Sequence, residues 1–549
     1  MTDRWSHSLP PTALPGARMP VLAGQVVATG QPIASQVGLD ILARGGTAAD
    51  AAIATAAALT VVEPTANGLG ADAFAMSWDG QRLHGINASG RAPAMLDVDR
   101  LRRNGIPRTG WDAVTVPGCV SGWVALWKLH GTLPFFDLLA PAIRLAEHGF
   151  PVSPQCAVAW RRAATRYEHF RGWQETFTRD GHTPEIGQWW TLPDHARTLR
   201  LIAETEGDAF YHGELAAAMA ADADAHNGAL SVEDLASHEA VDVDPLGVPF
   251  GDVVLHELPP NGQGLAALIA AGVLDRLQPA ALDADDPLLL HLQIEAMKLG
   301  FADAETHVAD PEHMCMCPQE LIAPERLDRL AAMIDPARAQ DLFAESPEWS
   351  STVYLCCADS KGRAVSFIQS NYEGFGSGIV VPGTGIAMQD RAAGFVDKPG
   401  HPNDIAGSKR PYHTIIPAFT TKNASAHMAF GVMGGPMQPQ GHLQVLSRIV
   451  AGGWDPQAAI DASRWRVEGG LDVSLEPDTP AATAAALGAM GHDITIAPQR
   501  DVSFGGAQAI LRLDDCWCGA SDGRRDGQAV GGTGPETAPG PTTHFNPSA

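Results

Sequence analysis

The pattern of hydrophobic residues changes near residue 350, and no other feature constrains the fold as much. Before this point, apolar residues recur with helical spacing at 136–148, 194–206, 214–227, 288–303 and 324–333. After it, short strand-like runs alternate with glycine turns. A chain of 549 residues exceeds what one hydrophobic core usually organises. We expect a helix-rich part, a strand-rich part and, over 532–549, a disordered tail rich in Gly, Pro and Thr.

A predicted β-hairpin begins at this change of pattern. Residues 351–359 and 361–366 are typical of two strands joined by a tight turn, with Thr352 at the entrance of the first strand. A β-branched threonine suits a strand for packing reasons, so Thr352 alone does not predict catalysis. Cys356 and Cys357 are predicted to be small strand residues on opposite faces of the sheet.

The motifs around Thr352 indicate a role for this residue beyond packing. The motifs at 374–378, 409–411 and 434–435 follow it, and further motifs precede it at 28–32, 45–52, 62–64, 68–74, 89–93, 116–118, 210–214, 259–264 and 295–298. In order and spacing, they resemble the gamma-glutamyltransferase (gamma-glutamyltranspeptidase) family over roughly residues 25–531. The resemblance implies an α+β fold, the four-layer αββα sandwich of N-terminal-nucleophile (Ntn) hydrolases. It also implies two chains from one precursor, a large subunit of residues 1–351 and a small subunit of residues 352–531, which form a heterodimer.

The same resemblance makes Thr352 the catalytic nucleophile. A threonine hydroxyl is a weak nucleophile and needs a base, which an N-terminal threonine carries as its own α-amine. That amine exists only after the bond between Ser351 and Thr352 is cut, so self-cleavage is expected there. Gly434 and Gly435 match the two backbone N–H groups that hold the oxyanion. Ser370 matches a family threonine whose hydroxyl supports the nucleophile.

The predicted substrate-binding residues are also assigned by resemblance. Arg91 matches the arginine that binds the substrate carboxylate through a bidentate fork. His413 and Thr414 stand where the family has two serines, and Tyr372 replaces an asparagine. Where the family has acidic residues that hold an α-ammonium, this chain has Ala393 and Gly394, with Arg391 nearby. The pocket is therefore expected to take an acyl group that carries a carboxylate and no amine.

Composition excludes several classes of partner. The net charge of −26 argues against nucleic acids and anionic membrane surfaces as partners. The N-terminus lacks an apolar core of signal-peptide length, and the alanine-rich segment 48–62 is too short to cross a bilayer, so a cytoplasmic protein is expected. The C-x-C pairs at 315–317 and 516–518 lack the spacing of common zinc sites. No metal or cofactor is expected.

Three functions stay open at this stage. The first is hydrolysis or transfer of gamma-glutamyl groups, as from glutathione. The second is an acylase acting on other carboxylated amides, such as glutaryl side chains of β-lactams or a small oxo-acid amide like oxamate. The third belongs to another class, a non-catalytic binding protein that never matures.

Overall fold

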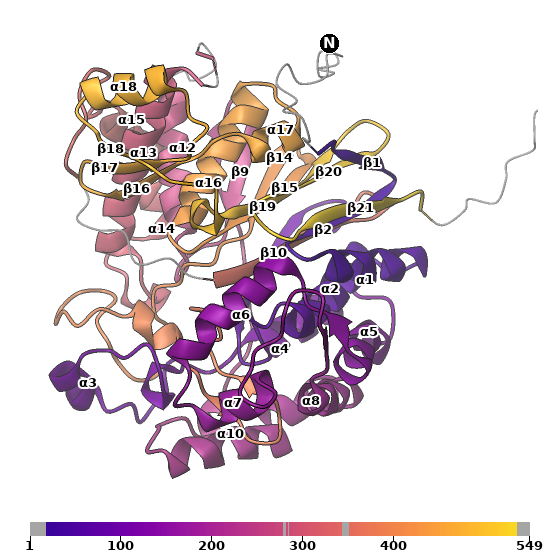
Figure 1. The fold of residues 1–549 in the computed structure, drawn as a ribbon. Coiled ribbons are helices and arrows are strands. Elements are labelled where there is room, and N and C mark those ends of the chain that lie inside the picture. Colours follow the sequence, from indigo (N-terminus) through magenta and orange to yellow (C-terminus); the bar gives the residue numbers. More distant parts are fainter. Residues whose placement is uncertain (1–17, 278–281, 284, 343–350, 535–549) are drawn as a thin grey trace, which may run out of the picture.

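Two seven-stranded antiparallel sheets stacked face to face form the centre of the protein (Figure 1). The structure, a computed structural model, describes residues 18–277, 282–283, 285–342 and 351–534. The β10 sheet has the order β21 (Gln528–Gly532), β2 (Gln25–Thr29), β10 (Ser351–Ala358), β11 (Ala364–Tyr372), β3 (Asp72–Trp78), β4 (Leu83–Asn87) and β7 (Val241–Val243). The β15 sheet has the order β1 (Val21–Ala23), β20 (Trp517–Ser521), β19 (Gly506–Arg512), β15 (Ser425–Met433), β14 (Ala418–Lys422), β9 (Val253–Glu257) and β8 (Leu246–Phe250).

An apolar core joins the two sheets. Tyr354 and Ile368 from the β10 sheet meet Phe419 and Ile510 from the β15 sheet, and all four are fully buried. The ring of Tyr354 lies so close to Gly431 that a Cβ there would be 2.5 Å from it, so only glycine fits at this point of β15. This close approach fixes the position of β15 over β10, the strand that begins with Ser351 and Thr352.

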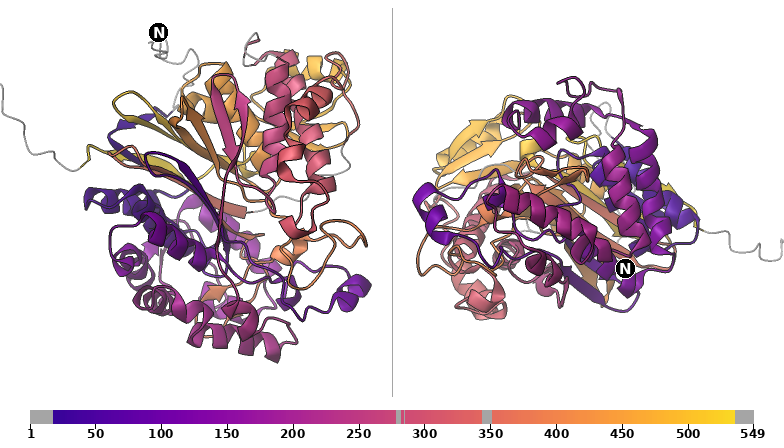
Figure 2. Two further views of the ribbon diagram at one scale, coloured as in Figure 1. Left: turned by 180° about the vertical axis from the view of Figure 1, so that it is seen from behind. Right: turned by 90° about the horizontal axis from the view of Figure 1, so that it is seen from below.

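Helices cover the outer face of each sheet. The β10 sheet packs against α1 (Pro32–Ala43), α2 (Ala48–Val62) and α4 (Cys119–His130), and the β15 sheet packs against α12 (Gly264–Arg276), α16 (Met437–Leu446) and α17 (Pro456–Asp461). Helix α13 (Pro287–His307) packs on α12. The layers are therefore helix, sheet, sheet and helix, as expected for an αββα sandwich, and the predicted fold class is confirmed (Figure 2).

The remaining elements extend both helical layers. Beyond α2 lie α5 (Phe135–His148), α6 (Pro154–Arg166), α7 (Arg171–Phe177), α8 (Pro193–Glu204), α9 (Asp208–Tyr211), α10 (Glu214–Ala225) and α11 (Val232–Ala236). On the other side, α15 (Pro324–Ala331) packs on α12, and α18 (Ala481–Ala489) packs on α13 beside the small sheet of β16 (Trp465–Gly469), β17 (Asp472–Leu475) and β18 (Asp493–Ile496). The short elements are α3 (Val98–Asn104), α14 (Pro318–Leu321), β5 (Phe150–Pro151), β6 (Trp189–Trp190), β12 (Val380–Val381) and β13 (Ile386–Ala387).

Helix α2 shows why an alanine-rich segment becomes the centre of a layer. Thr47 and Asp50 form a capping box at its N-terminus, and every residue from Ala48 to Val62 is buried. A helix that is apolar on all sides is buried on all sides, and small alanines let the neighbouring sheet and helices approach closely. No helix among the described residues is long and apolar enough to cross a membrane.

The two predicted subunits do not form separate lobes. Strands β10 and β11, which follow residue 350, lie between β2 and β3 of the first part of the chain, and β21 pairs with the other edge of β2. Cleavage at residue 351 would therefore leave two chains held together by a shared sheet. Gly532 pairs with Gln25 at the end of β21, so ordered structure continues into the first residue of the predicted tail. Residues 535–549 of that tail lie outside the described residues.

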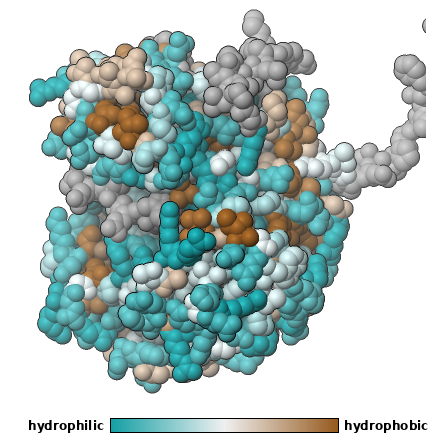
Figure 3. All heavy atoms as spheres, in the orientation of Figure 1, coloured by the Kyte–Doolittle hydropathy of each residue, from teal (hydrophilic) through white to brown (hydrophobic). Residues whose placement is uncertain are grey.

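The face of the molecule seen in Figure 3 is predominantly hydrophilic, with hydrophobic residues scattered in small groups. This agrees with 63 acidic and 37 basic side chains in the full sequence. An acidic, mixed surface of this kind favours solubility.

Candidate active site

Thr352 lies at the start of β10 with its hydroxyl inside a chain of hydrogen bonds. Its Oγ1 donates to Ser370 Oγ (3.2 Å), and Ser370 Oγ donates to the carbonyl oxygen of Ser351 (2.8 Å). The backbone N–H of Tyr372 donates to Ser370 Oγ (2.8 Å) and fixes its position. Ser370 therefore contacts the nucleophile and also polarises the carbonyl group that the nucleophile would attack during self-cleavage.

A β-bulge places Ser370 at this point. Ser351 pairs with Tyr372 and Val353 pairs with Gln369, so β11 has one residue more than β10 between these pairs. Bulges re-aim side chains and are common next to active sites. Tyr372 ends the bulge with φ of 77°, which is uncommon for a residue with a side chain.

Gly434 and Gly435 form the turn between β15 and α16. Their φ values of 125° and 59° lie in the region that favours glycine. Their carbonyl groups accept hydrogen bonds from Met437 and Gln438, whereas neither of their N–H groups donates to any described residue. Two unpaired donors beside the N-terminus of a helix suit a developing oxyanion.

Arg391 is the centre of a buried cluster beyond Tyr372. Its side chain is 1% exposed, its Nη1 donates to Thr414 Oγ1 (2.9 Å), and its guanidinium carbon lies 4.4 Å from the centroid of the Tyr372 ring. Its Nε and Nη2 have no hydrogen-bond partner among the described residues, although Nε lies 3.9 Å from Asp72 Oδ2. Two unpaired N–H groups on a buried guanidinium can accept a carboxylate in a bidentate pair.

His413 contributes to this cluster from the side of Asp72. Its Nε2 lies 3.0 Å from Asp72 Oδ2, and its Nδ1 accepts from the N–H of Ile415 (3.4 Å). Burial, with a contribution from Arg391, holds the pKa of His413 well below its usual value, so the ring is neutral and donates from Nε2. His413 therefore orients Asp72, while its neighbour Thr414 contacts Arg391. Gln263 links this loop to the glycine turn because its Nε2 donates to the carbonyls of Thr414 and Gly435.

Sequence reasoning missed three polar residues of the site. Asp72 accepts from the N–H groups of Gly90 (3.3 Å) and Gly118 (3.2 Å), and burial raises its pKa to about 7 despite Arg391 nearby. Burial likewise raises the pKa of Asp390 to about 8. Both atoms of the buried Asn371 side-chain amide have no partner among the described residues. The signal for Asp72 was an acidic residue at the start of an otherwise apolar strand.

These acids correct one expectation about the pocket. Ala393 and Gly394 supply no charge, as expected, but Asp72 and Asp390 place two carboxyl groups around Arg391. The cluster is therefore not free of acidic groups. Because burial raises the pKa of Asp390 to about 8 and that of Asp72 to about 7, Asp390 is largely protonated and Asp72 about half protonated at pH 7, so together they compensate the charge of Arg391 only in part.

Arg91 already has partners in this structure. Its Nη1 donates to Asp310 Oδ2 (2.8 Å) and to the carbonyl oxygen of Ser408 (3.0 Å), and its Nη2 donates to Glu312 Oε1 (3.1 Å). A bidentate contact with a substrate carboxylate would have to replace these ion pairs. The role of Arg91 in binding substrate stays a prediction.

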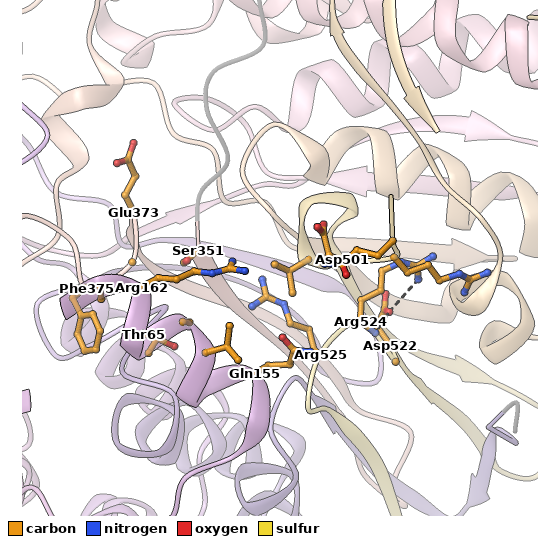
Figure 4. A pocket seen from close by; sticks show the side chains of 18 of the residues that line it. Thr65, Gln155, Arg162, Ser351, Glu373, Phe375, Asp501, Asp522, Arg524 and Arg525 are labelled. Carbon is orange, nitrogen blue, oxygen red and sulfur yellow. Dashed lines mark hydrogen bonds and ion pairs between the residues drawn. The ribbon is translucent and has the colours of Figure 1, made fainter. Parts of the chain in front are cut away.

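A cavity of about 610 Å³ opens at Ser351, on the side of α6 and of the turn that follows β20 (Figure 4). Its lining includes Thr65, Arg162, Ser351, Glu373, Arg524 and Arg525. The side chain of Thr352 is fully buried next to this cavity, whereas Ser351 reaches its wall. The cavity therefore begins one residue from the nucleophile, at Ser351.

One group of described residues has the composition of a metal site, far from Thr352 in sequence. His291, Glu295 and His492 are buried, with potential ligand atoms within 4.8 Å of one another. His291 Nδ1 lies 2.8 Å from His492 Nε2, and Glu295 pairs with Lys298 (2.9 Å). Two nitrogen ligands of a tetrahedral zinc ion lie roughly 3.3 Å apart, given Zn–N bonds of about 2.0 Å. The arrangement is that of a hydrogen-bonded pair.

Comparison with known proteins places this geometry in a family. The sequence model of gamma-glutamyltranspeptidase matches residues 34–532. The chain belongs to the gamma-glutamyltranspeptidase family. It is 37% identical to the oxamate amidohydrolase proenzyme of Klebsiella pneumoniae, an alignment that covers 91% of this chain and 97% of that protein. It is 32% identical to the glutathione hydrolase-like YwrD proenzyme of Bacillus subtilis, with 92% and 98% covered.

A solved structure agrees with the family assignment. The crystal structure of cephalosporin acylase from Bacillus halodurans superposes with a TM-score of 0.90 at 43% identity, covering 96% of this chain and 99% of that one. The predictions that the chain belongs to this family and is a hydrolase acting on amides are confirmed. The roles of individual site residues rest on the geometry described above.

Proposed function

We propose that this member of the family is a self-processing amidohydrolase specific for amides whose acyl group carries a carboxylate and no α-ammonium. The observation that carries the proposal is Arg391, a buried cation whose Nε and Nη2 have no hydrogen-bond partner among the described residues. Three contacts connect Thr352 to Arg391. Thr352 Oγ1 donates to Ser370 Oγ, the N–H of Tyr372 donates to the same oxygen, and the Arg391 guanidinium lies over the Tyr372 ring. This short path suits a small acyl group.

Self-processing is supported by the hydrogen bonds around Ser351. In this proposal, Thr352 Oγ attacks the carbonyl carbon of Ser351 while Ser370 stabilises the carbonyl oxygen. The acyl group moves from nitrogen to oxygen, and water hydrolyses the resulting ester. The products are residues 1–351 and a second chain that begins at Thr352 and carries a free α-amine.

The mature enzyme then uses the same oxygen on its substrate. The α-amine of Thr352, with an ordinary pKa of about 8, takes the hydroxyl proton as Oγ attacks the amide carbon. The N–H groups of Gly434 and Gly435 stabilise the tetrahedral oxyanion. The α-amine returns the proton to the leaving nitrogen, an acyl-threonine forms, and water releases the carboxylic acid.

A second candidate is hydrolysis of gamma-glutamyl amides such as glutathione. It is favoured by the two buried carboxyl groups of Asp72 and Asp390, which would bind an α-ammonium if the substrate drew them into their ionised form. One of the two relatives named above is glutathione hydrolase-like. Arg391 opposes this function because it would lie beside the α-ammonium as a like charge.

A substrate panel separates these functions. Glutaryl, oxamate and gamma-glutamyl amides are compared by kcat/KM after a denaturing gel and N-terminal sequencing have established two chains, the second starting at Thr352. The proposal expects faster hydrolysis of the glutaryl or oxamate amide than of the gamma-glutamyl amide. A preference of several hundredfold for the gamma-glutamyl substrate would establish the second candidate. An uncut chain without activity would instead indicate the non-catalytic binding protein.

A further inference from the structure

The side chains of two arginines on the wall of the cavity at Ser351 have no hydrogen-bond partner among the described residues. The side chain of Arg525 is 8% exposed, and its Nε and Nη2 are buried and unpaired. The nearest acid is Glu63, whose Oε1 lies 3.8 Å from Arg525 Nη1. Arg162 is exposed on α6, and its guanidinium and that of Arg525 lie in the cavity next to Ser351 (Figure 4).

The other arginines of the cavity are matched. Arg166 pairs with Glu373 (2.6 Å), and Arg524 is held by Asp522 (3.1 Å) and by Glu476. Among the described residues, the unpaired positive charge of the cavity is therefore concentrated at Arg162 and Arg525.

Glu63, the acid that lies 3.8 Å from Arg525, compensates little of this charge. Burial raises the pKa of Glu63 to about 8, so its carboxyl group is largely protonated at pH 7. A buried guanidinium without a matched anion is costly, which points to an anionic ligand.

The position of the group that protonates the leaving nitrogen identifies which part of the substrate occupies this cavity. The leaving nitrogen must receive its proton from the α-amine of Thr352, and that amine forms where Ser351 is now attached. Ser351 lines the cavity. The leaving amine therefore lies on the cavity side of Thr352, whereas the acyl group lies towards Arg391.

We propose that this cavity binds the leaving amine of the substrate, and that Arg525 together with Arg162 binds a carboxylate carried by that amine. The inference rests on the proposed function and narrows it to N-acyl amino acids with an acidic group on each side of the scissile bond. Oxamate, whose leaving group is ammonia, would leave both arginines without a carboxylate partner.

Product binding tests the inference without requiring turnover. L-Phenylalanine and phenethylamine differ by the carboxylate alone, and both are titrated into the mature protein by calorimetry. Wild type should bind phenylalanine about 10- to 100-fold more tightly, the range expected for hydrogen bonds to a charged group. Arg525→Gln should reduce this preference to about twofold or less. Arg162→Gln, on an exposed helix face, should also reduce it and serves if Arg525→Gln does not fold.

Arg500→Gln is the matched control. Arg500 lines the same cavity but is already paired with Asp478 and with the carbonyl oxygen of Asp461, so its replacement should leave the preference unchanged. Equal binding of the two ligands by wild type, or an unchanged preference in both Arg525→Gln and Arg162→Gln, would overturn the inference.

Turnover separates this inference from the function on which it rests. Glutaryl-L-phenylalanine and glutaryl-phenethylamide share one acyl group, and wild type should show a kcat/KM about 10- to 100-fold higher for the first. Equal rates would reject the carboxylate site while the amidohydrolase stands. If neither compound is cleaved, the proposed acyl specificity fails, and the calorimetric comparison still decides whether Arg525 and Arg162 bind a carboxylate.

Discussion

Replacing Arg391 with glutamine should remove recognition of the acyl carboxylate while keeping the fold and the nucleophile. The guanidinium is 1% exposed and offers Nε and Nη2 to a substrate, with Nη1 bound to Thr414. Glutamine has similar length but lacks the charge and the fork. Asp72 loses a nearby cation, but burial already raises its pKa to about 7, so it responds by protonating and no isolated buried charge remains.

The magnitude follows from leaving a carboxylate unpaired in a buried site. Removing one partner of a buried, hydrogen-bonded charge pair costs about 2–5 kcal/mol. At about 1.4 kcal/mol for each factor of ten, kcat/KM for a glutaryl amide should fall by roughly 30- to several thousandfold. A butyryl amide with the same leaving group lacks the carboxylate, and its kcat/KM should change by less than about threefold.

The assay compares both substrates with wild type and Arg391→Gln after a gel has shown equal maturation. Arg391→Lys keeps the charge without the planar fork, and its kcat/KM for the glutaryl amide should lie between those of wild type and Arg391→Gln. Equal losses for the glutaryl and butyryl amides would show that Arg391 acts on the nucleophile or on the fold. An unchanged kcat/KM for the glutaryl amide would show that the carboxylate binds elsewhere, and Arg91 would become the leading candidate.

Three further predictions concern maturation, the oxyanion and pH. Ser370→Ala should slow cleavage at Ser351 by at least tenfold on a time-resolved gel, whereas Ser370→Thr should retain it; equal rates would remove Ser370 from the reaction. Gly435→Pro should lower kcat by at least about 10² to 10³, because it removes one N–H donor and because proline cannot adopt the φ of 59° found there, and unchanged turnover of matured protein would place the oxyanion site elsewhere. Because the folded state holds a proton on Asp72 up to about pH 7 and the unfolded state loses it near pH 4, this group makes the free energy of unfolding fall between those values. Asp72→Asn should flatten that fall by up to about 1.4 kcal/mol per pH unit in denaturant titrations, and identical slopes would contradict the raised pKa.

Local patterns were sufficient for the elements that have strong periodicity and clear ends. Helix α1 ends before Gly45, whose φ of 89° suits glycine, so the glycine pair at 45–46 is a local signal for the end of a helix. Cys356 lies between the sheets and Cys357 lies on the side of α2, as their alternation predicts. Helix α16, whose residues are all buried, was not predicted because it carries Pro439, Gly441 and several glutamines that bond to neighbouring backbone. Its stability comes from tertiary contacts that no local pattern contains.

The candidate site likewise contains residues that a local motif locates and contacts that only the folded chain forms. Thr352, Ser370 and the glycine pair lie in motifs with recognisable spacing, so a family resemblance locates them. The contacts around Arg391 cannot be read from any single motif, because Asp72 and His413 are 341 residues apart and meet only when the sheets stack. The ion pairs of Arg91 with Asp310 and Glu312 are equally non-local. Charge compensation between distant residues depends on the finished fold, and a sequence pattern gives no direct sign of it.

The uncleaved chain gives one reason why catalysis must follow processing. Thr352 is 0% exposed, and Ser351 lies between it and the cavity. Its backbone nitrogen is part of an amide, which has no lone pair available for a proton. In the proposed mechanism, breaking the bond after Ser351 creates the α-amine at the cavity wall and frees that position for the leaving group of a substrate. One bond cleavage thus supplies the base and the access together, and Ser370, which contacts both residues, couples the two steps.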